Sequence, residues 1–218
     1  MGAKISGIGT NILMIEGVKT LGGVDSIDVI PDRIEAGTFL IAVAATGGKV
    51  KLNNVEPKHM ESVISLLRKS NIDIVEDKDS IIVTSNGLDI KACDMETHEY
   101  PGFPTDLQAQ WMLLMSLASG DSTIKENIYF DRFTHILELN RLGCDVHLED
   151  GSAAIKGDRS LIGASVMSTD IRASAALIIA ALCAEGSTSI SRVYHIDRGY
   201  DKIEEKLAKV GAKITRKK

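Results

Sequence analysis

The sequence is poor in cysteine, with three in 218 residues. Cys93, Cys144 and Cys183 are odd in number, lie far apart and form no CxxC or Cys–His pairing, which argues against disulfide staples and a zinc site. We expect reduced thiols in a cytosolic protein, packed as small apolar side chains. The five histidines are scattered as well. We therefore assign no metal.

Long apolar runs and a surplus of positive charge are also missing. The longest apolar stretch, residues 173–184, is too short to span a bilayer and is typical of a buried core helix. The N-terminus lacks the basic and then apolar layout of a secretion signal. The net charge of −5 argues against a protein that binds nucleic acid by neutralising phosphates. The lone GxG at residues 7–9 opens no helix, so no dinucleotide cofactor is expected.

The sequence does contain a threefold internal repeat. Its units begin at Asp32, Asp106 and Asp170, each placed just before an apolar helix. These helices are predicted to stop at Gly47, Gly120 and Gly186. A short strand, an amphipathic second helix and a further strand follow in each unit. The second helices are predicted to end at Asn71, Gly143 and Gly211, residue types that favour the left-handed C′ conformation.

The apolar character of the first helices predicts the architecture. Because they are apolar nearly all round, we expect them to be central and buried, with the second helices outside. Three such units, each ordered strand, helix, strand, helix, strand, strand, predict an α/β (α+β) domain of pseudo-threefold character over residues 31–218. Residues 1–30 match the final strand pair of a preceding domain plus a linker. We therefore expect a piece of a longer protein, whose third unit is one strand short.

Four arginines fall where helix electrostatics disfavours them. Arg33 and Arg172 lie in the predicted first turns of central helices, and Arg132 and Arg198 at the predicted starts of outer helices. A cation there opposes the helix dipole, at a cost of about 0.3–1 kcal/mol if exposed. Either each is neutralised by a nearby Asp in a structural ion pair, or several converge with helix N-termini on a shared phosphate or carboxylate.

The aspartates have a structural explanation too, because Asp is a favoured N-cap. Asp106 differs from the other two, since neutral residues follow it and no adjacent arginine neutralises it. A carboxylate placed among converging arginines could orient a substrate hydroxyl and deprotonate it in the transition state. Asp106 is therefore the candidate for chemistry.

Several long motifs carry a resemblance to a known family. "GTNILMIEGV", "PDRIEAGTFL", "FPTDLQAQ", "STDIRASAALI" and "YHIDRGYDKIEEKL" resemble the bacterial UDP-N-acetylglucosamine enolpyruvyl transferases (1-carboxyvinyltransferases), and the match runs along essentially the whole chain. The resemblance implies an inside-out α/β barrel fold, with two domains of three repeats each. It also implies transfer of the enolpyruvyl group of phosphoenolpyruvate to the 3′-hydroxyl of UDP-N-acetylglucosamine, with release of phosphate, as the first committed step of peptidoglycan synthesis.

The resemblance assigns roles to individual residues. Asp106 is implied as the base at the sugar hydroxyl and Arg198 as the arginine that grips phosphoenolpyruvate. Arg33 has no such role and is expected to be structural. The implied substrate-binding set is Asp106, Ile128, Arg132, Asp170, Arg172 and Arg198.

The sequence also departs from the family. Its Lys-Asn pair and its flexible loop with a catalytic cysteine or aspartate are absent from these 218 residues. We therefore expect the chain alone to be inactive and to depend on a missing N-terminal catalytic domain. Two alternatives stay open: a 5-enolpyruvylshikimate-3-phosphate synthase, which shares the fold and chemistry, and a non-catalytic clamp or scaffold on nucleic acid. The clamp is disfavoured because the apolar helices offer no lysines to line a hole.

Overall fold

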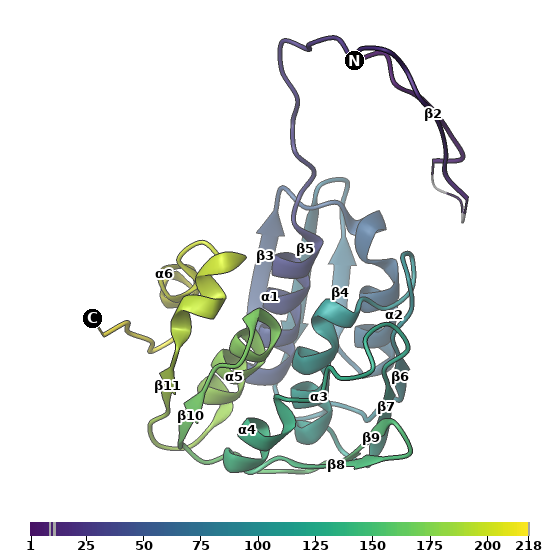
Figure 1. Cartoon of the computed structure of the whole chain (residues 1–218). Helices are drawn as coiled ribbons and strands as arrows, with labels where there is room; N and C mark the ends of the chain where they lie inside the picture. Colours follow the sequence, from purple (N-terminus) through teal and green to yellow (C-terminus); the bar gives the residue numbers. More distant parts are fainter. Residues whose placement is uncertain (9, 11, 218) are drawn as a thin grey trace. The chain divides into compact units, whose positions relative to one another are not determined.

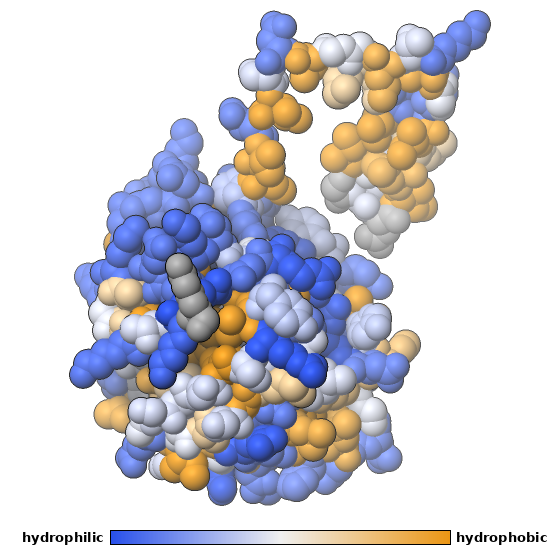
Figure 2. Space-filling view, turned by 60° about the vertical axis from the view of Figure 1, so that its left-hand side comes forward, coloured by the Kyte–Doolittle hydropathy of each residue, from blue (hydrophilic) through white to orange (hydrophobic). Residues whose placement is uncertain are grey.

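The computed structural model describes residues 1–8, 10 and 12–217, and the chain divides into two compact units. The first unit, Met1–Pro31, holds the antiparallel strands β1 (Lys4–Ser6) and β2 (Met14–Glu16), so the strand pair expected within residues 1–30 is present. Most large apolar side chains of this unit are exposed within it, and Figure 2 shows them as an apolar surface.

The second unit, Asp32–Lys218, is built around three buried helices. These are α1 (Arg33–Thr46), α3 (Gln108–Leu117) and α5 (Ile171–Cys183), which contact one another in its centre (Figure 1). Burying a large apolar side chain contributes about 1.5–3 kcal/mol, so helices that are apolar on nearly all sides are driven to the middle of the core. The prediction of central, buried helices is confirmed.

The second helix of each of the three repeats is shorter than predicted. The three outer helices are α2 (Glu61–Lys69), α4 (Ile136–Arg141) and α6 (Ile203–Lys209). Before α4, residues 130–135 form turns whose backbone hydrogen bonds span two or three residues, such as Arg132 N to Tyr129 O. The 3-10 helices η1 (Pro57–Met60) and η3 (Val193–Arg198) precede α2 and α6.

These tight turns overturn part of the helix-dipole argument. Arg132 lies among the turns before α4, and Arg198 is the last residue of η3, so neither occupies the first turn of an outer helix as predicted. Arg33 and Arg172 do lie in the first turns of α1 and α5. The electrostatic cost therefore applies to two of the four arginines.

Left-handed residues follow the outer helices as predicted. Asn71 has φ +68°, Gly143 +105° and Gly211 +104°. Gly2, the residue that the repeat places at the same position before β1, has φ +83°. The repeat therefore extends into backbone conformation, where a positive φ favours glycine and asparagine.

Three sheets accompany the helices. The first is antiparallel in the order β3 (Gly48–Asn53), β5 (Ser80–Ser85), β4 (Asp73–Glu76). The second has the order β6 (Met95–Glu96), β7 (Ser122–Lys125), β9 (Ser152–Lys156), β8 (Asp145–Glu149), with β6 and β7 parallel. The third pairs β10 (Ser165–Met167) with β11 (Ser189–Ser191) in parallel. In the second and third repeats the strand before the central helix therefore pairs with the strand after it, as the repeat predicts. The third repeat is two strands short rather than one, because no strand follows α6 in residues 210–217.

Two central helices end before their predicted glycines. α3 ends at Leu117 rather than next to Gly120, and α5 at Cys183 rather than next to Gly186. The residues between turn to strand pairing, because Ser119 N donates to Ile90 O and Glu185 N donates to Leu161 O. Pairing with the preceding segment thus replaces the last helical hydrogen bonds.

Candidate functional site

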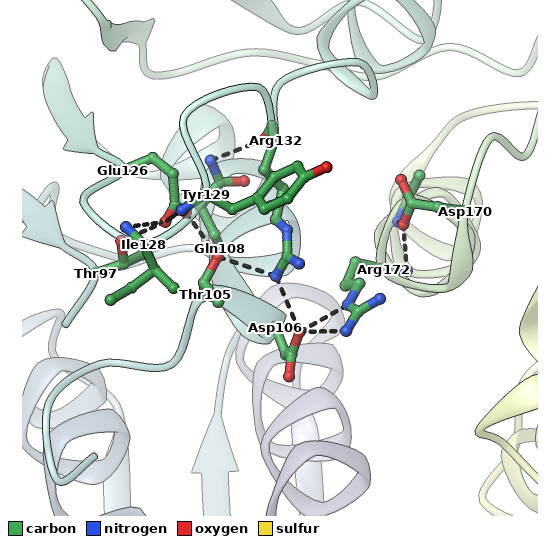
Figure 3. Close-up of polar contacts among 11 residues, drawn as sticks. Thr97, Thr105, Asp106, Gln108, Glu126, Ile128, Tyr129, Arg132, Asp170 and Arg172 are labelled. Atoms are coloured by element: carbon green, nitrogen blue, oxygen red, sulfur yellow. Dashed lines mark hydrogen bonds and ion pairs between the residues drawn. The ribbon is translucent and has the colours of Figure 1, made fainter. Parts of the chain in front are cut away.

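One aspartate and two arginines from different elements form the centre of the candidate site (Figure 3). Asp106 lies in the 3-10 helix η2 (Thr105–Leu107), directly before α3. Its Oδ1 accepts hydrogen bonds from Arg132 Nη1 at 2.9 Å and Arg172 Nε at 2.7 Å, and lies 2.6 Å from Arg172 Nη2. Its Oδ2 has no hydrogen-bond partner among the described residues. One carboxylate oxygen is therefore saturated while the other is available.

The structure changes the interpretation of the three aspartates. Asp32 and Asp170 cap α1 and α5, each accepting hydrogen bonds from two backbone N–H groups of the first turn. Asp106 caps no helix, because Pro104 occupies the N-cap of η2 and no side-chain cap bond forms there. The sequence showed no arginine beside Asp106, yet Arg132 and Arg172, 26 and 66 residues away, both neutralise it.

Arg132 is fixed from several sides. Its backbone O accepts a hydrogen bond from Gln108 Nε2 at 3.2 Å, which ties the turn to α3. Its Nη1 donates to Thr105 Oγ1 at 3.0 Å as well as to Asp106. The Tyr129 ring lies beside its guanidinium group, with 5.1 Å between Cζ and the ring centroid. Such a contact over an aromatic face is a cation–π interaction.

A buried glutamate supports this arrangement, and the sequence interpretation missed it. Glu126 Oε1 accepts hydrogen bonds from Thr97 Oγ1 (2.7 Å), Ile128 N (2.9 Å) and Tyr129 N (3.0 Å), and Oε2 accepts one from Thr105 Oγ1 (2.8 Å). Figure 3 shows the carboxylate between these donors.

The sequence did hold a signal for Glu126. It continues the inward positions of β7, because Ser122, Ile124 and Glu126 alternate with exposed residues and all three are buried. A charged residue at an inward position of an alternating strand is uncommon unless it is paired or hydrogen-bonded. The alternation therefore marks Glu126 as a buried carboxylate that needs hydrogen-bond partners, although the sequence interpretation did not use this signal.

The remaining predicted residues lie outside the hydrogen-bonded cluster, or touch it only through the backbone. Ile128 has an exposed side chain and reaches Glu126 through its N–H. Arg198 is exposed and makes no hydrogen bond or ion pair within the described part of the chain. The Arg33 guanidinium lies over the Tyr100 ring at 5.1 Å, consistent with a structural role. The binding roles assigned to Ile128 and Arg198 stay predictions.

Other titratable groups in the core are held in their neutral forms. Burial lowers the pKa of His135 to about 4, so this ring is uncharged at neutral pH. Burial raises the pKa of Cys144 to about 11 and that of Cys183 to about 12, so both thiols stay protonated. A thiol of this kind is a poor nucleophile. These cysteines pack as the small apolar side chains that the sequence predicted.

Metal-binding clusters and membrane-spanning helices are absent from residues 1–8, 10 and 12–217. This part of the chain holds no group of three or more His, Cys, Asp or Glu side chains arranged to bind a metal ion. Among its helices, none combines the length and the apolar character needed to cross a membrane.

Comparison with known proteins gives a consistent family. The family described as EPSP synthase (3-phosphoshikimate 1-carboxyvinyltransferase) matches residues 1–207. The UDP-N-acetylglucosamine 1-carboxyvinyltransferase of Geotalea uraniireducens is 50% identical over 99% of the chain, which covers 51% of that relative. The protein of the same name from Bartonella henselae is 52% identical over 99% of the chain, which covers 50% of it. The chain thus spans about half the length of these relatives.

Solved structures agree on the fold. The enolpyruvyl transferase NikO from Streptomyces tendae matches with a TM-score of 0.87 and 25% identity, over 98% of this chain and 51% of NikO. An EPSP synthase from Acinetobacter baumannii matches with a TM-score of 0.66 and 15% identity, over 88% of this chain and 45% of the synthase. The second likeness supports the fold alone.

Proposed function

Because the chain belongs to the EPSP synthase (3-phosphoshikimate 1-carboxyvinyltransferase) family, we propose that it forms about half of an enolpyruvyl transferase whose acceptor is UDP-N-acetylglucosamine. The acceptor is inferred from relatives about 50% identical that carry that name, whereas the EPSP synthase structures are only 15–16% identical. The parent protein then moves the enolpyruvyl group of phosphoenolpyruvate to the 3′-hydroxyl and releases phosphate. This reaction is the first committed step of peptidoglycan synthesis, in the cytoplasm.

The available oxygen of Asp106 is the observation that carries the proposal. Two arginines hold Oδ1, so the orientation of the carboxylate is fixed while Oδ2 can accept the substrate hydroxyl. As the hydroxyl oxygen bonds to C2 of phosphoenolpyruvate, its proton passes to Asp106, and C3 takes a proton from an acid outside this chain. The conjugate base of that acid then takes a proton back from C3, the C2–C3 double bond forms again, and the C2–O bond to phosphate breaks. Such a positioned base typically contributes 10²–10⁴-fold to the rate.

The arginines suit the second substrate. Phosphoenolpyruvate carries a phosphate and a carboxylate, both of which match the two-pronged donor geometry of guanidinium groups. Arg198, exposed at the end of η3, is the proposed anchor for this anion. Arg132 and Arg172 add positive charge around the reacting hydroxyl while they orient Asp106.

Calorimetric titration of the chain with each substrate tests the proposal. We expect Asp106→Asn to weaken UDP-N-acetylglucosamine binding by about tenfold, the loss of one hydrogen bond to a charged group. Arg198→Ala should weaken phosphoenolpyruvate binding alone. Asp150→Asn is the matched control, because Asp150 is exposed in the β8–β9 turn with φ +48°, which Asn also tolerates. Equal effects of Asp106→Asn and Asp150→Asn would contradict the proposal.

Binding of shikimate 3-phosphate distinguishes the alternative, a 5-enolpyruvylshikimate-3-phosphate synthase, from the proposed function. Shikimate 3-phosphate should neither bind the chain at concentrations that saturate it with UDP-N-acetylglucosamine nor compete with the sugar nucleotide. Tight binding of shikimate 3-phosphate instead would assign the chain to the sister enzyme and leave the role of Asp106 unchanged.

A further inference from the structure

We propose that Glu126 is a positioning residue, which fixes Arg132 and through it Asp106 in the geometry that the acceptor hydroxyl requires. This inference rests on the proposed function. The side chain of Glu126 is 2% exposed, and no Lys or Arg of the described residues lies within ion-pair distance of it. A buried carboxylate without a cation is costly unless hydrogen bonds replace its water. Four protein donors do so here.

The first connection from Glu126 to Arg132 runs through the Thr105 hydroxyl. A carboxylate only accepts hydrogen bonds and a guanidinium group only donates them. The hydroxyl therefore has a fixed direction: it donates to Glu126 Oε2 at 2.8 Å and accepts from Arg132 Nη1 at 3.0 Å. Arg132 Nη1 is in turn 2.9 Å from Asp106 Oδ1. Figure 3 shows this series of contacts.

The second connection runs through the loop that follows β7. Glu126 Oε1 accepts hydrogen bonds from the N–H groups of Ile128 and Tyr129, which holds the loop in a tight turn. The turn places the Tyr129 ring beside the Arg132 guanidinium group. It also sets the position of Ile128, the predicted contact to the sugar nucleotide. One carboxylate thus orders both the proposed base and the proposed sugar contact.

Glutamine is the informative replacement for Glu126. Its amide oxygen can still face the two loop N–H groups and Thr97, which leaves the amide nitrogen toward Thr105. That nitrogen is a donor, so the Thr105 oxygen would meet donors from both the introduced amide group and Arg132, and its own proton would lose its acceptor. Glu126→Gln therefore disturbs the first connection while it largely preserves the loop.

The mobility of Arg132 in the ligand-free chain tests the positioning directly. Nuclear magnetic resonance of labelled arginine measures the rate of rotation about the Nε–Cζ bond of Arg132. We expect Glu126→Gln and Thr105→Val to raise this rate by about tenfold, in line with the loss of one hydrogen bond to a charged group. Thr105→Ser keeps the hydroxyl and should leave the rate unchanged. Glu149→Gln, in the exposed end of β8, is the control for the change of charge.

Substrate binding supplies the second measurement. Glu126→Gln and Thr105→Val should each raise the dissociation constant for UDP-N-acetylglucosamine by about tenfold and leave that for phosphoenolpyruvate unchanged. Their effects should not add in the double variant, because both act on the same contact. If Glu126 and Thr105 only supported the fold, their replacement would weaken the binding of both substrates together, and Thr105→Ser would not preserve that binding.

The outcomes separate the inference from the proposed function. Unchanged rotation of Arg132 in Glu126→Gln and Thr105→Val overturns the positioning role, whatever the chain binds. If Glu126→Gln does not fold, the comparison of Thr105→Val with Thr105→Ser decides. Faster rotation in a chain that binds neither substrate supports the positioning of Arg132 and contradicts the enolpyruvyl transferase proposal instead.

Discussion

At the scale of single residues, the orientation of the Asp106 carboxylate depends on the two-pronged donor geometry of the Arg172 guanidinium group. Arg172 reaches Oδ1 with both Nε and Nη2, which a lysine ammonium cannot do. The pair is about one third exposed, so solvent screens it and the stability lost in Arg172→Lys should stay below about 1 kcal/mol. UDP-N-acetylglucosamine binding should weaken several-fold, because Asp106 loses its fixed orientation.

Urea unfolding and calorimetric titration check this separation. Arg141→Lys is the control, since Arg141 is exposed and lies 3.7 Å from Glu138. A loss of stability much larger than in the control, with binding unchanged, would show that Arg172 serves the fold and not the site.

His135 predicts how stability depends on pH. Burial lowers its pKa to about 4 from 6.5, so the unfolded chain binds a proton in this range and the folded chain does not. The contribution to stability is fully present above pH 6.5 and is lost as the pH falls toward 4. A shift of this size corresponds to about 3 kcal/mol over the whole window.

Urea unfolding at pH 7, 6 and 5 measures the effect. His135→Gln should remove most of the slope between pH 6.5 and 5, because glutamine does not titrate, whatever the substitution costs at pH 7. The same slope in both proteins would mean that other groups carry the pH dependence.

The residue types of the site could be predicted from the sequence, but their partners could not. Asp106 and Arg172 stood out by their position before and within apolar helices. Their contact joins residues 66 positions apart, which no local pattern encodes. Arg132 was predicted as a site residue because it should oppose the dipole of an outer helix. It does not face that dipole, since short-range backbone bonds replace the first turn of α4. Glu126 was missed because period-two alternation was not followed past the end of β7.

At the scale of elements, Gly157 marks a close backbone approach after β9. A Cβ at this position would lie 2.1 Å from Gly120 O and 2.3 Å from Ala118 O, and backbone atoms cannot move aside cheaply. We expect Gly157→Ala to destabilise the chain by about 1–3 kcal/mol, the usual cost of overpacking. Gly17→Ala, where a Cβ meets no atom within 4 Å, should change stability by less than about 0.5 kcal/mol. Urea unfolding compares the two.

A buried polar cluster joins elements from all three repeats. The Tyr200 hydroxyl, after η3, lies 2.8 Å from Thr38 Oγ1 in α1, and Gln110 Nε2 in α3 donates to the same threonine at 3.1 Å. Burial raises the pKa of Tyr200 to about 12, so the hydroxyl keeps its proton at neutral pH. Tyr200→Phe should cost about 1–2 kcal/mol, since Thr38 loses a buried partner.

A double-mutant cycle isolates this contact. Tyr200→Phe and Thr38→Val together should destabilise the chain by less than the sum of the single changes, with a coupling of about 0.5–3 kcal/mol. Additive free energies of unfolding would show that the cluster does not bind the units together.

Elements whose pattern is long and regular were predictable, and their ends were not. The central helices follow from apolar runs of about ten residues or more, which only a buried helix accommodates. The ends of α3 and α5 depend on Ser119 and Glu185, which pair with residues 29 and 24 positions earlier in the chain. Each helix ends two residues before the residue whose N–H makes that pairing, and the sequence of the helix itself holds no record of it.

At the scale of the whole molecule, we predict that the 218-residue chain alone releases no phosphate from phosphoenolpyruvate in the presence of UDP-N-acetylglucosamine. The chain spans about half the length of its relatives, and we expect the acid that protonates C3 to lie in the part of the parent protein that these 218 residues do not include. A coupled assay for phosphate measures this, with a full-length relative as the positive control. Turnover comparable to that control would place the complete reaction within these residues.

The repeat made the architecture readable because three copies of one weak pattern reinforce each other. Caps, glycines and apolar faces recur at Asp32 and Asp170 in sequence and again in backbone geometry. Sheet composition was less accessible, since strands of two or three residues such as β6 and β10 carry almost no periodicity.

The three repeats are unequally supported, since within the described residues their sheets contain three, four and two strands. Local opening is cheapest where backbone pairing is sparse. Arg172 and Arg198 both belong to the repeat with two strands, whereas Arg132 belongs to the repeat with four, so two of the three arginines proposed for the site lie where backbone pairing is sparsest. A bound anion would hold the repeat with two strands closed, and amide hydrogen exchange in α6 would slow more than exchange in α2. Binding of the anion would then also stabilise the repeat that opens most easily.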